Sequence, residues 1–126
     1  YQQLMGDSVD KDTVIRAVKD MFKDKADILP TADVIIDEVC KFYNIENELL
    51  RGQGRTKDTA LARQIAMYQI RRMTNLSLDD IGREFENRDH STVLHSIKRV
   101  EKLIRDDPEL AEIIKDINAN INSRYE

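Results

Sequence analysis

The sequence is poor in residues that break helices, form cross-links or fill aromatic cores. Its 126 residues include four glycines, two prolines, one cysteine and no tryptophan, and only 6% are aromatic. So few breakers predict a mostly helical chain of about one domain. The single cysteine, Cys40, excludes a disulfide within the chain and fits a reducing compartment, so we expect a cytoplasmic protein.

Long apolar runs are missing as well. No stretch stays apolar over the roughly 20 residues that a membrane-spanning helix needs, and no secretory signal segment is recognisable. We therefore expect no membrane span. The chain also lacks an initiating methionine, and we expect it to be part of a longer protein.

Charged residues are abundant and unevenly distributed. The net charge is −4, but residues 51–105 hold 12 Lys/Arg and 7 Asp/Glu, whereas residues 1–50 hold 6 and 11 and residues 106–126 hold 2 and 6. A basic centre between acidic ends favours one surface for a polyanion, with the ends held away from it. Chance clustering on a solvated helical face is the alternative.

Apolar residues at helical spacing predict six helices. They cover residues 10–24, 32–45, 59–74, 77–86, 90–105 and 108–121. Pro30 interrupts the pattern and marks a boundary between residues 1–29 and residues 30–126. Residues 46–58 contain Gly52 and Gly54 and are expected to form a loop, of which residues 51–58 are expected to be mobile in the free protein.

Side chains at the predicted helix starts support this division. Thr31 is placed to cap the second helix, and Ser77 with Asp80 forms a capping-box pattern before the fourth. In the second helix Ile35, Val39 and Phe42 are expected on one face. The short helix 77–86, the turn 87–89 and the longer helix 90–105 together indicate a helix-turn-helix.

The segment RDHSTVLHSIKRV, residues 88–100, gathers the side chains of greatest chemical interest. Asp89, His90 and Ser91 are consecutive, so near a helix start their directions diverge by about 100° per residue and they cannot form a catalytic relay. His90 and His95 point roughly 140° apart, and the sequence has no other histidine to complete a metal shell. We therefore expect neither a catalytic residue nor a metal site.

Recognition of a nucleic acid suits the same segment better. Side chains in the first turn of a helix project forward and can reach base edges in a major groove; here they are Asp89, His90, Ser91 and Thr92. Farther along, His95, Lys98, Arg99 and Lys102 lie off the apolar stripe, where they can meet phosphates. The alternative is that Asp89 only caps the helix and that the others form a solvated face.

Three motifs resemble the C-terminal DNA-binding domain of the bacterial replication initiators of the DnaA family. They are RTKDTALARQIAMYQ, TNLSLDDIGREFENRDH and NRDHSTVLHSIKRVEKL. The family signature is Gly-Gly-Arg-Asp-His-[Ser/Thr]-Thr-Val-x-His after a Ser-Leu-x-x-Ile-Gly helix. The resemblance is strong over about residues 31–105. Residues 1–29 resemble more weakly the last helix of the lid of the family's AAA+ ATPase domain.

The resemblance implies an all-α, Trp-repressor-like helical bundle with a helix-turn-helix over residues 30–126, preceded by a lid or connector helix. It implies base contacts from Asp89, His90 and Ser91, a phosphate contact from Thr92, and Arg55 in a minor groove. The other DNA-binding residues that we expect are Lys57, Arg63, Gln64, Arg71, Leu78, Arg88, His95, Lys98 and Arg99.

The same resemblance implies the partners. They are double-stranded DNA at origin boxes and regulatory proteins on this domain, with acidic phospholipids a partner of the parent protein. The phosphate-binding run Gly-x-x-x-x-Gly-Lys-[Ser/Thr] is missing from this sequence. ATP and Mg²⁺ would therefore belong to the rest of the parent chain. For these 126 residues we expect no enzyme activity and no cofactor. The expected location is the cytoplasm, at the nucleoid.

Three departures from the family pattern stand out. Glu86 and Asn87 replace the two glycines; Asn tolerates the left-handed conformation, but Glu86 adds negative charge beside DNA. Gln53 and Gly54 replace basic residues of the loop, and Ala62 replaces a frequent proline. From the first two departures, in the turn and in the loop, we expect weaker non-specific attraction with the reading residues kept.

Two other interpretations fit parts of the sequence. A helix-turn-helix regulator unrelated to replication would share the architecture without the Arg-Asp-His-Ser-Thr signature. A helical protein-interaction module would suit the acidic total charge.

Overall fold

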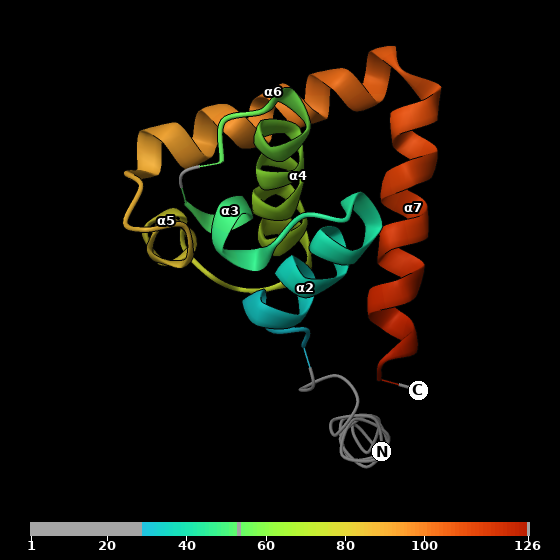
Figure 1. Ribbon diagram of the computed structural model, residues 1–126, viewed down its shortest axis with the longest axis horizontal. Helices are drawn as coiled ribbons and strands as arrows, with labels where there is room; N and C mark the ends of the chain where they lie inside the picture. Colours follow the sequence, from blue (N-terminus) through green and yellow to red (C-terminus); the bar gives the residue numbers. More distant parts are fainter. Residues whose placement is uncertain (1–28, 53, 126) are drawn as a thin grey trace, which may run out of the picture.

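The computed structural model describes residues 29–52 and 54–125, and every regular element in them is a helix (Figure 1). The helices are α2 (Ala32–Tyr43), α3 (Asn47–Arg51), α4 (Lys57–Met73), α5 (Leu78–Glu84), α6 (His90–Asp106) and α7 (Pro108–Ser123). The predicted all-α class is confirmed. The helix predicted over residues 10–24 and the lid remnant at 1–29 lie outside the described residues, Leu29 excepted.

Helix α4 is the centre of the packing. It contacts α2, α3, α5 and α6, while α7 packs against α2 and α6. Figure 1 shows α6 lying across one end of the bundle and α7 running down its side. The core is mostly aliphatic, with Ile65, Ile70, Ile81 and Val100 fully buried together with the ring of Phe85. Each such side chain contributes about 1.5–3 kcal/mol by leaving water, so α4 fixes where α5 and α6 sit.

Side-chain caps define the helix starts. Thr31 accepts a hydrogen bond from the Val34 amide at 3.2 Å, and Ser77 and Asp80 form the predicted capping box. Thr56 caps α4 by accepting from the Thr59 amide at 3.1 Å. This cap moves the start of α4 to Lys57, two residues before the predicted start.

One local prediction was wrong. Residues 47–51, expected in a loop, form the one-and-a-half-turn helix α3, because Leu50 is fully buried and the Arg51 Nε donates to Asn47 Oδ1 at 2.7 Å. Phe42, predicted on the same helix face as the buried Ile35 and Val39, is 41% exposed near the end of α2, and its ring lies edge-on to that of Tyr43.

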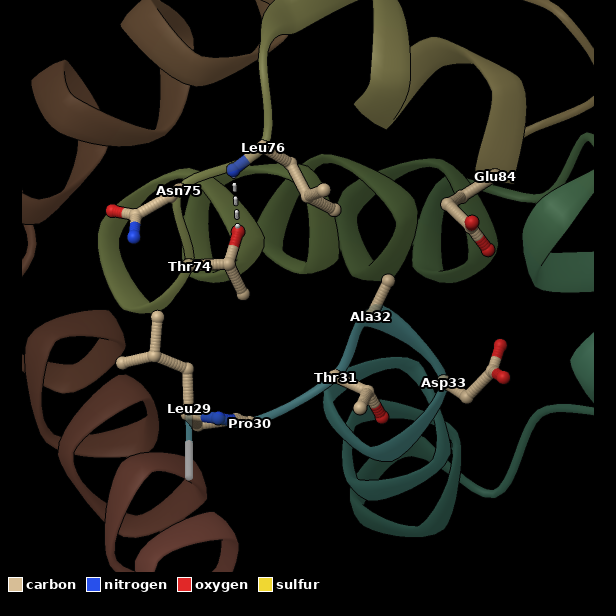
Figure 2. A pocket seen from close by; sticks show the side chains of 9 residues that line it. All are labelled: Leu29, Pro30, Thr31, Ala32, Asp33, Thr74, Asn75, Leu76 and Glu84. Carbon is tan, nitrogen blue, oxygen red and sulfur yellow. Dashed lines mark hydrogen bonds between the residues drawn. The ribbon is translucent and has the colours of Figure 1, made fainter. Parts of the chain in front are cut away.

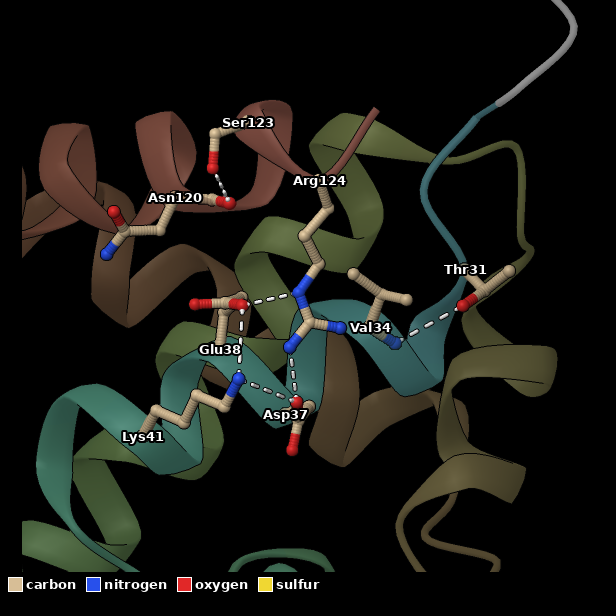
Figure 3. A network of polar contacts seen from close by, with 8 residues as sticks. All are labelled: Thr31, Val34, Asp37, Glu38, Lys41, Asn120, Ser123 and Arg124. Carbon is tan, nitrogen blue, oxygen red and sulfur yellow. Dashed lines mark hydrogen bonds and ion pairs between the residues drawn. The ribbon is translucent and has the colours of Figure 1, made fainter. Parts of the chain in front are cut away.

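The far end of α7 is fastened to α2 by Arg124 (Figure 3). Its Nε and terminal nitrogen donate to Glu38 and Asp37, both at 2.5 Å, and Lys41 pairs with the same two carboxylates. The hydrogen bond from Arg124 is the main reason why the pKa of Asp37 is lowered. Parts of the two acidic segments, α2 and the residue that follows α7, therefore meet here in an ion-pair network.

Candidate nucleic-acid interface

The turn between α5 and α6 depends on one close approach. The amides of Phe85 and Arg88 both donate to the Gly82 carbonyl, at 3.0 and 3.1 Å. A Cβ on Gly82 would lie 2.0 Å from the Arg88 carbonyl oxygen. Only glycine therefore allows α5 to lie against the turn at this distance.

The residues that replace the two family glycines both adopt the left-handed conformation. Glu86 has φ 60° and Asn87 has φ 59°. Asparagine enters this region readily, as expected of Asn87, whereas a glutamate there costs roughly 1–2 kcal/mol. The turn keeps this left-handed backbone geometry even though neither of these two residues is a glycine.

The first turn of α6 exposes four polar side chains, which we call the recognition head: Asp89, His90, Ser91 and Thr92. Asp89 is the N-cap, and its Oδ1 accepts from the Thr92 amide at 2.8 Å. This hydrogen bond lowers the pKa of Asp89, so the carboxylate is charged at neutral pH. Asp89 caps the helix, as the alternative interpretation held, and is also exposed.

The first turn of α5 lies beside the recognition head. The Asp79 Oδ1 is 3.6 Å from the His90 Nδ1, and both side chains are about two-thirds exposed. Leu78, half-buried, precedes Asp79 at the start of the same helix. Asp79 was not among the residues predicted for the site, although its place next to Leu78 in the Ser-Leu-Asp-Asp-Ile-Gly motif was a usable signal.

Helices α4 and α6 bring further predicted residues together. Gln64 on α4 lines a shallow hollow with Ser91, Thr92 and His95 of α6. A neighbouring hollow of about 550 Å³ is lined in part by Lys57, Gln64, His95 and Arg99. Lys98 and Lys102 are exposed on α6 as well. The side of α6 and the first half of α4 thus share one surface, on which these polar side chains lie among apolar ones such as Leu61 and Leu103.

Arg55 lies between α3 and α4, just before the Thr56 cap, and is exposed. None of the residues that the structure describes forms a hydrogen bond or ion pair with its guanidinium. Arg55 therefore meets the geometric requirement for a side chain that reaches a ligand.

Three other predicted arginines bond to carbonyl groups of the protein itself. Arg63 donates to the carbonyls of Leu49, Leu50 and Gly54, at 3.0, 2.6 and 2.9 Å. Arg88 donates to Gly52 at 2.8 Å and to Phe85 at 3.3 Å, and Arg71 donates to Leu76 at 3.2 Å. The loop expected to be mobile is therefore held on both sides of residue 53.

The remaining surface of the described residues shows no second candidate site among those searched for. A hollow of about 460 Å³ lies where the chain enters α2, between Leu29–Asp33 and Thr74–Leu76 (Figure 2), and none of the predicted DNA-binding residues lines it. Within residues 29–52 and 54–125, no group of three or more His, Cys, Asp or Glu side chains could hold a metal ion. No helix in this part of the chain is long and apolar enough to cross a bilayer.

A short helix, a glycine-dependent turn and a longer helix with an exposed polar head define a helix-turn-helix domain. A family model described as "Bacterial dnaA protein helix-turn-helix" matches residues 32–100. Proteins named chromosomal replication initiator protein DnaA, from Neisseria meningitidis serogroup C and Neisseria gonorrhoeae, are each 43% identical over 104 residues, which cover 82% of this chain. The chain belongs to the bacterial DnaA helix-turn-helix family. It spans about a fifth, 20%, of the length of the curated relatives that it matches.

Proposed function

We propose that this domain binds duplex DNA sequence-specifically, at the origin boxes from which bacterial chromosome replication starts. The observation that carries the proposal is the recognition head, exposed at the start of a helix that α5 and α4 hold in place. The names of the relatives, which are replication initiators, support the biological setting. The cytoplasm, at the nucleoid, is where this function would operate.

The head of α6 would enter the major groove. The Asp89 carboxylate can accept from a cytosine amino group, hydroxyls such as that of Ser91 suit either kind of base, and the Thr92 methyl can contact a thymine methyl if it is not turned to a phosphate. His95, Lys98 and Arg99 on the side of α6 would then face the phosphate backbone, together with Gln64 of α4. Leu78 and Arg71 would lie at the edge of this contact.

Arg55 would reach the adjacent minor groove. An arginine suits a narrow A·T-rich groove because negative potential is concentrated there and a guanidinium loses its water easily. Lys57, two residues on, would contact a phosphate. A helix in one groove with a side chain in the next resembles the grip of a homeodomain with its arm.

The direct test is a titration of the domain with a labelled origin-box duplex and with a scrambled duplex, both at one stated salt concentration. We expect a clear preference for the box. Equal affinity for the two duplexes would refute sequence-specific binding. No binding to either would favour the protein-interaction alternative.

His90 tests the major-groove arrangement, because its side chain is exposed at the first turn of α6. His90→Ala should weaken box binding by about 1–3 kcal/mol and relax discrimination at one base pair. Binding to scrambled DNA should barely change. An equal loss on both duplexes would make His90 a structural residue.

Arg55 and Lys57 test the minor-groove arrangement. Arg55→Ala should lose most on a box with an A·T-rich end and little where that end is G·C. Lys57→Ala should weaken all sequences alike and lower the salt slope by about one ion. Equal losses for the two variants, independent of the box end, would reduce both to interchangeable surface charges.

The domain should need no cofactor for this binding, since ATP and Mg²⁺ chemistry would belong to the rest of the parent protein. Calorimetry with ATP is therefore expected to show no binding, and saturable micromolar binding would contradict this. Regulatory proteins that dock on the domain and phospholipid contact by the parent protein stay predictions.

A further inference from the structure

We propose that Arg63 and Arg88 are positioning residues rather than DNA contacts. They hold the Arg55 loop against the α5–α6 turn, so that the minor-groove and major-groove elements act as one rigid unit. We call these two side chains the arginine brace. The inference rests on the proposed function and concerns how its two reading elements keep their relative position.

Hydrogen bonds from Arg63 fix the loop that carries Arg55. Arg63 reaches from α4 to three carbonyls, those of Leu49, Leu50 and Gly54, with its Nε and one terminal nitrogen. The Gly54 amide in turn donates to Leu49 at 3.1 Å, which closes the loop on itself. The backbone just before Arg55 is therefore fixed by a side chain of the central helix.

Arg88 connects this loop to the helix-turn-helix, because Arg88 belongs to the turn that precedes the recognition head. One of its terminal nitrogens bonds to the Gly52 carbonyl and the other to the Phe85 carbonyl. It thereby links the loop before α4 to the turn before α6, across 36 residues of sequence. Asp89, the first residue of the recognition head, follows directly in the chain.

The electrostatics fit a role inside the protein. Burial, followed by the nearby positive charge of Arg88, lowers the pKa of Arg63, and Glu86 opposes this effect. Two neighbouring guanidinium groups normally repel each other, but here carbonyl oxygens and a carboxylate surround them. A Cβ on Gly52 would lie 2.2 Å from a Glu86 carboxylate oxygen, which places that acid against the same loop. Glu86 thus compensates for positive charge that is buried in the brace.

A substitution that keeps the charge separates positioning from phosphate contact. Lysine retains a cation but cannot reach three carbonyls with a planar fork. We expect Arg63→Lys to bind the box more weakly and to lose the preference for an A·T-rich over a G·C-rich box end. The salt slope should stay unchanged. Arg105→Lys, in the exposed last turn of α6, is the matched control and should behave as wild type.

A double-mutant cycle with Arg55→Ala sharpens the test. If the brace positions Arg55, Arg55→Ala should have little further effect in the Arg63→Lys background. Independent residues would multiply their effects within about twofold. Hydrogen exchange of the free protein gives a readout without DNA: the Gly54 amide should exchange faster in Arg63→Lys than in wild type. If Arg63→Lys does not fold, Arg88→Lys takes its place in the binding measurements, because Arg88 holds the same loop through the Gly52 carbonyl.

The outcomes are distinct. Wild-type binding by Arg63→Lys, or a salt slope lowered by about 0.9 in Arg63→Ala, would overturn the brace and make Arg63 a phosphate contact. Multiplicative effects with Arg55→Ala would overturn the positioning role. A wild-type protein that did not prefer the box over scrambled DNA would instead refute the proposed function itself.

Discussion

Gly82, in the last turn of α5, allows a prediction in which the direction of the change in stability tests the structure. Replacing a glycine inside a helix by alanine normally stabilises the helix by about 1 kcal/mol. At Gly82 the added methyl group would lie 2.0 Å from the Arg88 carbonyl oxygen and 3.2 Å from its carbon. These are backbone atoms, so the turn must move by about an ångström to reach an ordinary contact distance.

The magnitude follows from the contacts that this movement disturbs. Overpacking of this kind costs about 1–3 kcal/mol. The hydrogen bond from the Arg88 amide to the Gly82 carbonyl, now 3.1 Å, would be lost or lengthened, at about 1 kcal/mol. After subtracting the gain in helix propensity, we expect Gly82→Ala to destabilise the domain by about 1–3 kcal/mol. For a domain of roughly 100 residues this lowers the Tm by about 5–15 °C.

Urea and thermal unfolding followed by circular dichroism would measure the effect. Arg83→Ala, at an exposed position of the same helix, is the control and should change the Tm only slightly. Because Arg88 adjoins the recognition head, box binding by Gly82→Ala should also fall at temperatures where the variant is folded. An unchanged or raised Tm would refute the dependence of the turn on this close approach.

Other substitutions test the turn, the cap and the C-terminal network. Glu86→Gly should be more stable than Glu86→Gln by about 0.5–1 kcal/mol in urea unfolding, since both remove the charge but only glycine relieves the left-handed strain; equal stability would refute this strain. Asp89→Asn should keep the Tm at pH 7, because asparagine caps helices as well as aspartate does, yet lose box discrimination in the duplex titration. Unchanged discrimination would leave Asp89 as a cap only. Arg124→Ala should lower the Tm at pH 7. The folded pKa of Asp37 lies below its unfolded value, so its contribution is complete above about pH 4 and is lost as the pH falls through the folded value. The Tm difference between wild type and Arg124→Ala should therefore shrink in acid, and a constant difference from pH 7 to pH 3 would contradict this ion pair.

Local signals in the sequence were sufficient for most of the fold. Helical spacing of apolar residues located every long helix among the described residues, and Thr31 and Ser77 marked two of their starts correctly. Helix α3 escaped because five residues are too short for a periodic pattern to emerge, and two nearby glycines favoured a loop. Its stability comes from burying Leu50 and from the ion pairs of Arg51 with Asp33 and Glu84, which are distant in sequence.

The candidate site, like the fold, was predicted from the sequence only in part. Exposure of the recognition head follows from its position before the first apolar residue of α6, Val93, so the sequence alone located it. The direction of an arginine side chain has no such local signal. Arg63 and Arg88 were grouped with Arg55 because all three lie in basic, motif-rich segments, but the carbonyls to which two of them bond lie 3 to 36 residues away.

The number of Lys and Arg residues therefore overstates the number of cations that the domain can offer to DNA. Residues 51–105 hold 12 Lys/Arg, yet five arginines in that range donate to other groups of the protein: Arg51, Arg63, Arg71, Arg83 and Arg88. The exposed cations that remain on the candidate surface are Arg55, Lys57, Lys98, Arg99 and Lys102. At about 0.9 per neutralised phosphate, five contacts give a slope of log K against log salt of about −4.5, whereas 12 would give about −11. Binding of the box measured between 50 and 300 mM salt decides between them. A slope much steeper than −5 would mean that the internally bonded arginines turn to phosphates on binding, and the division between bracing and reading residues would have to be abandoned.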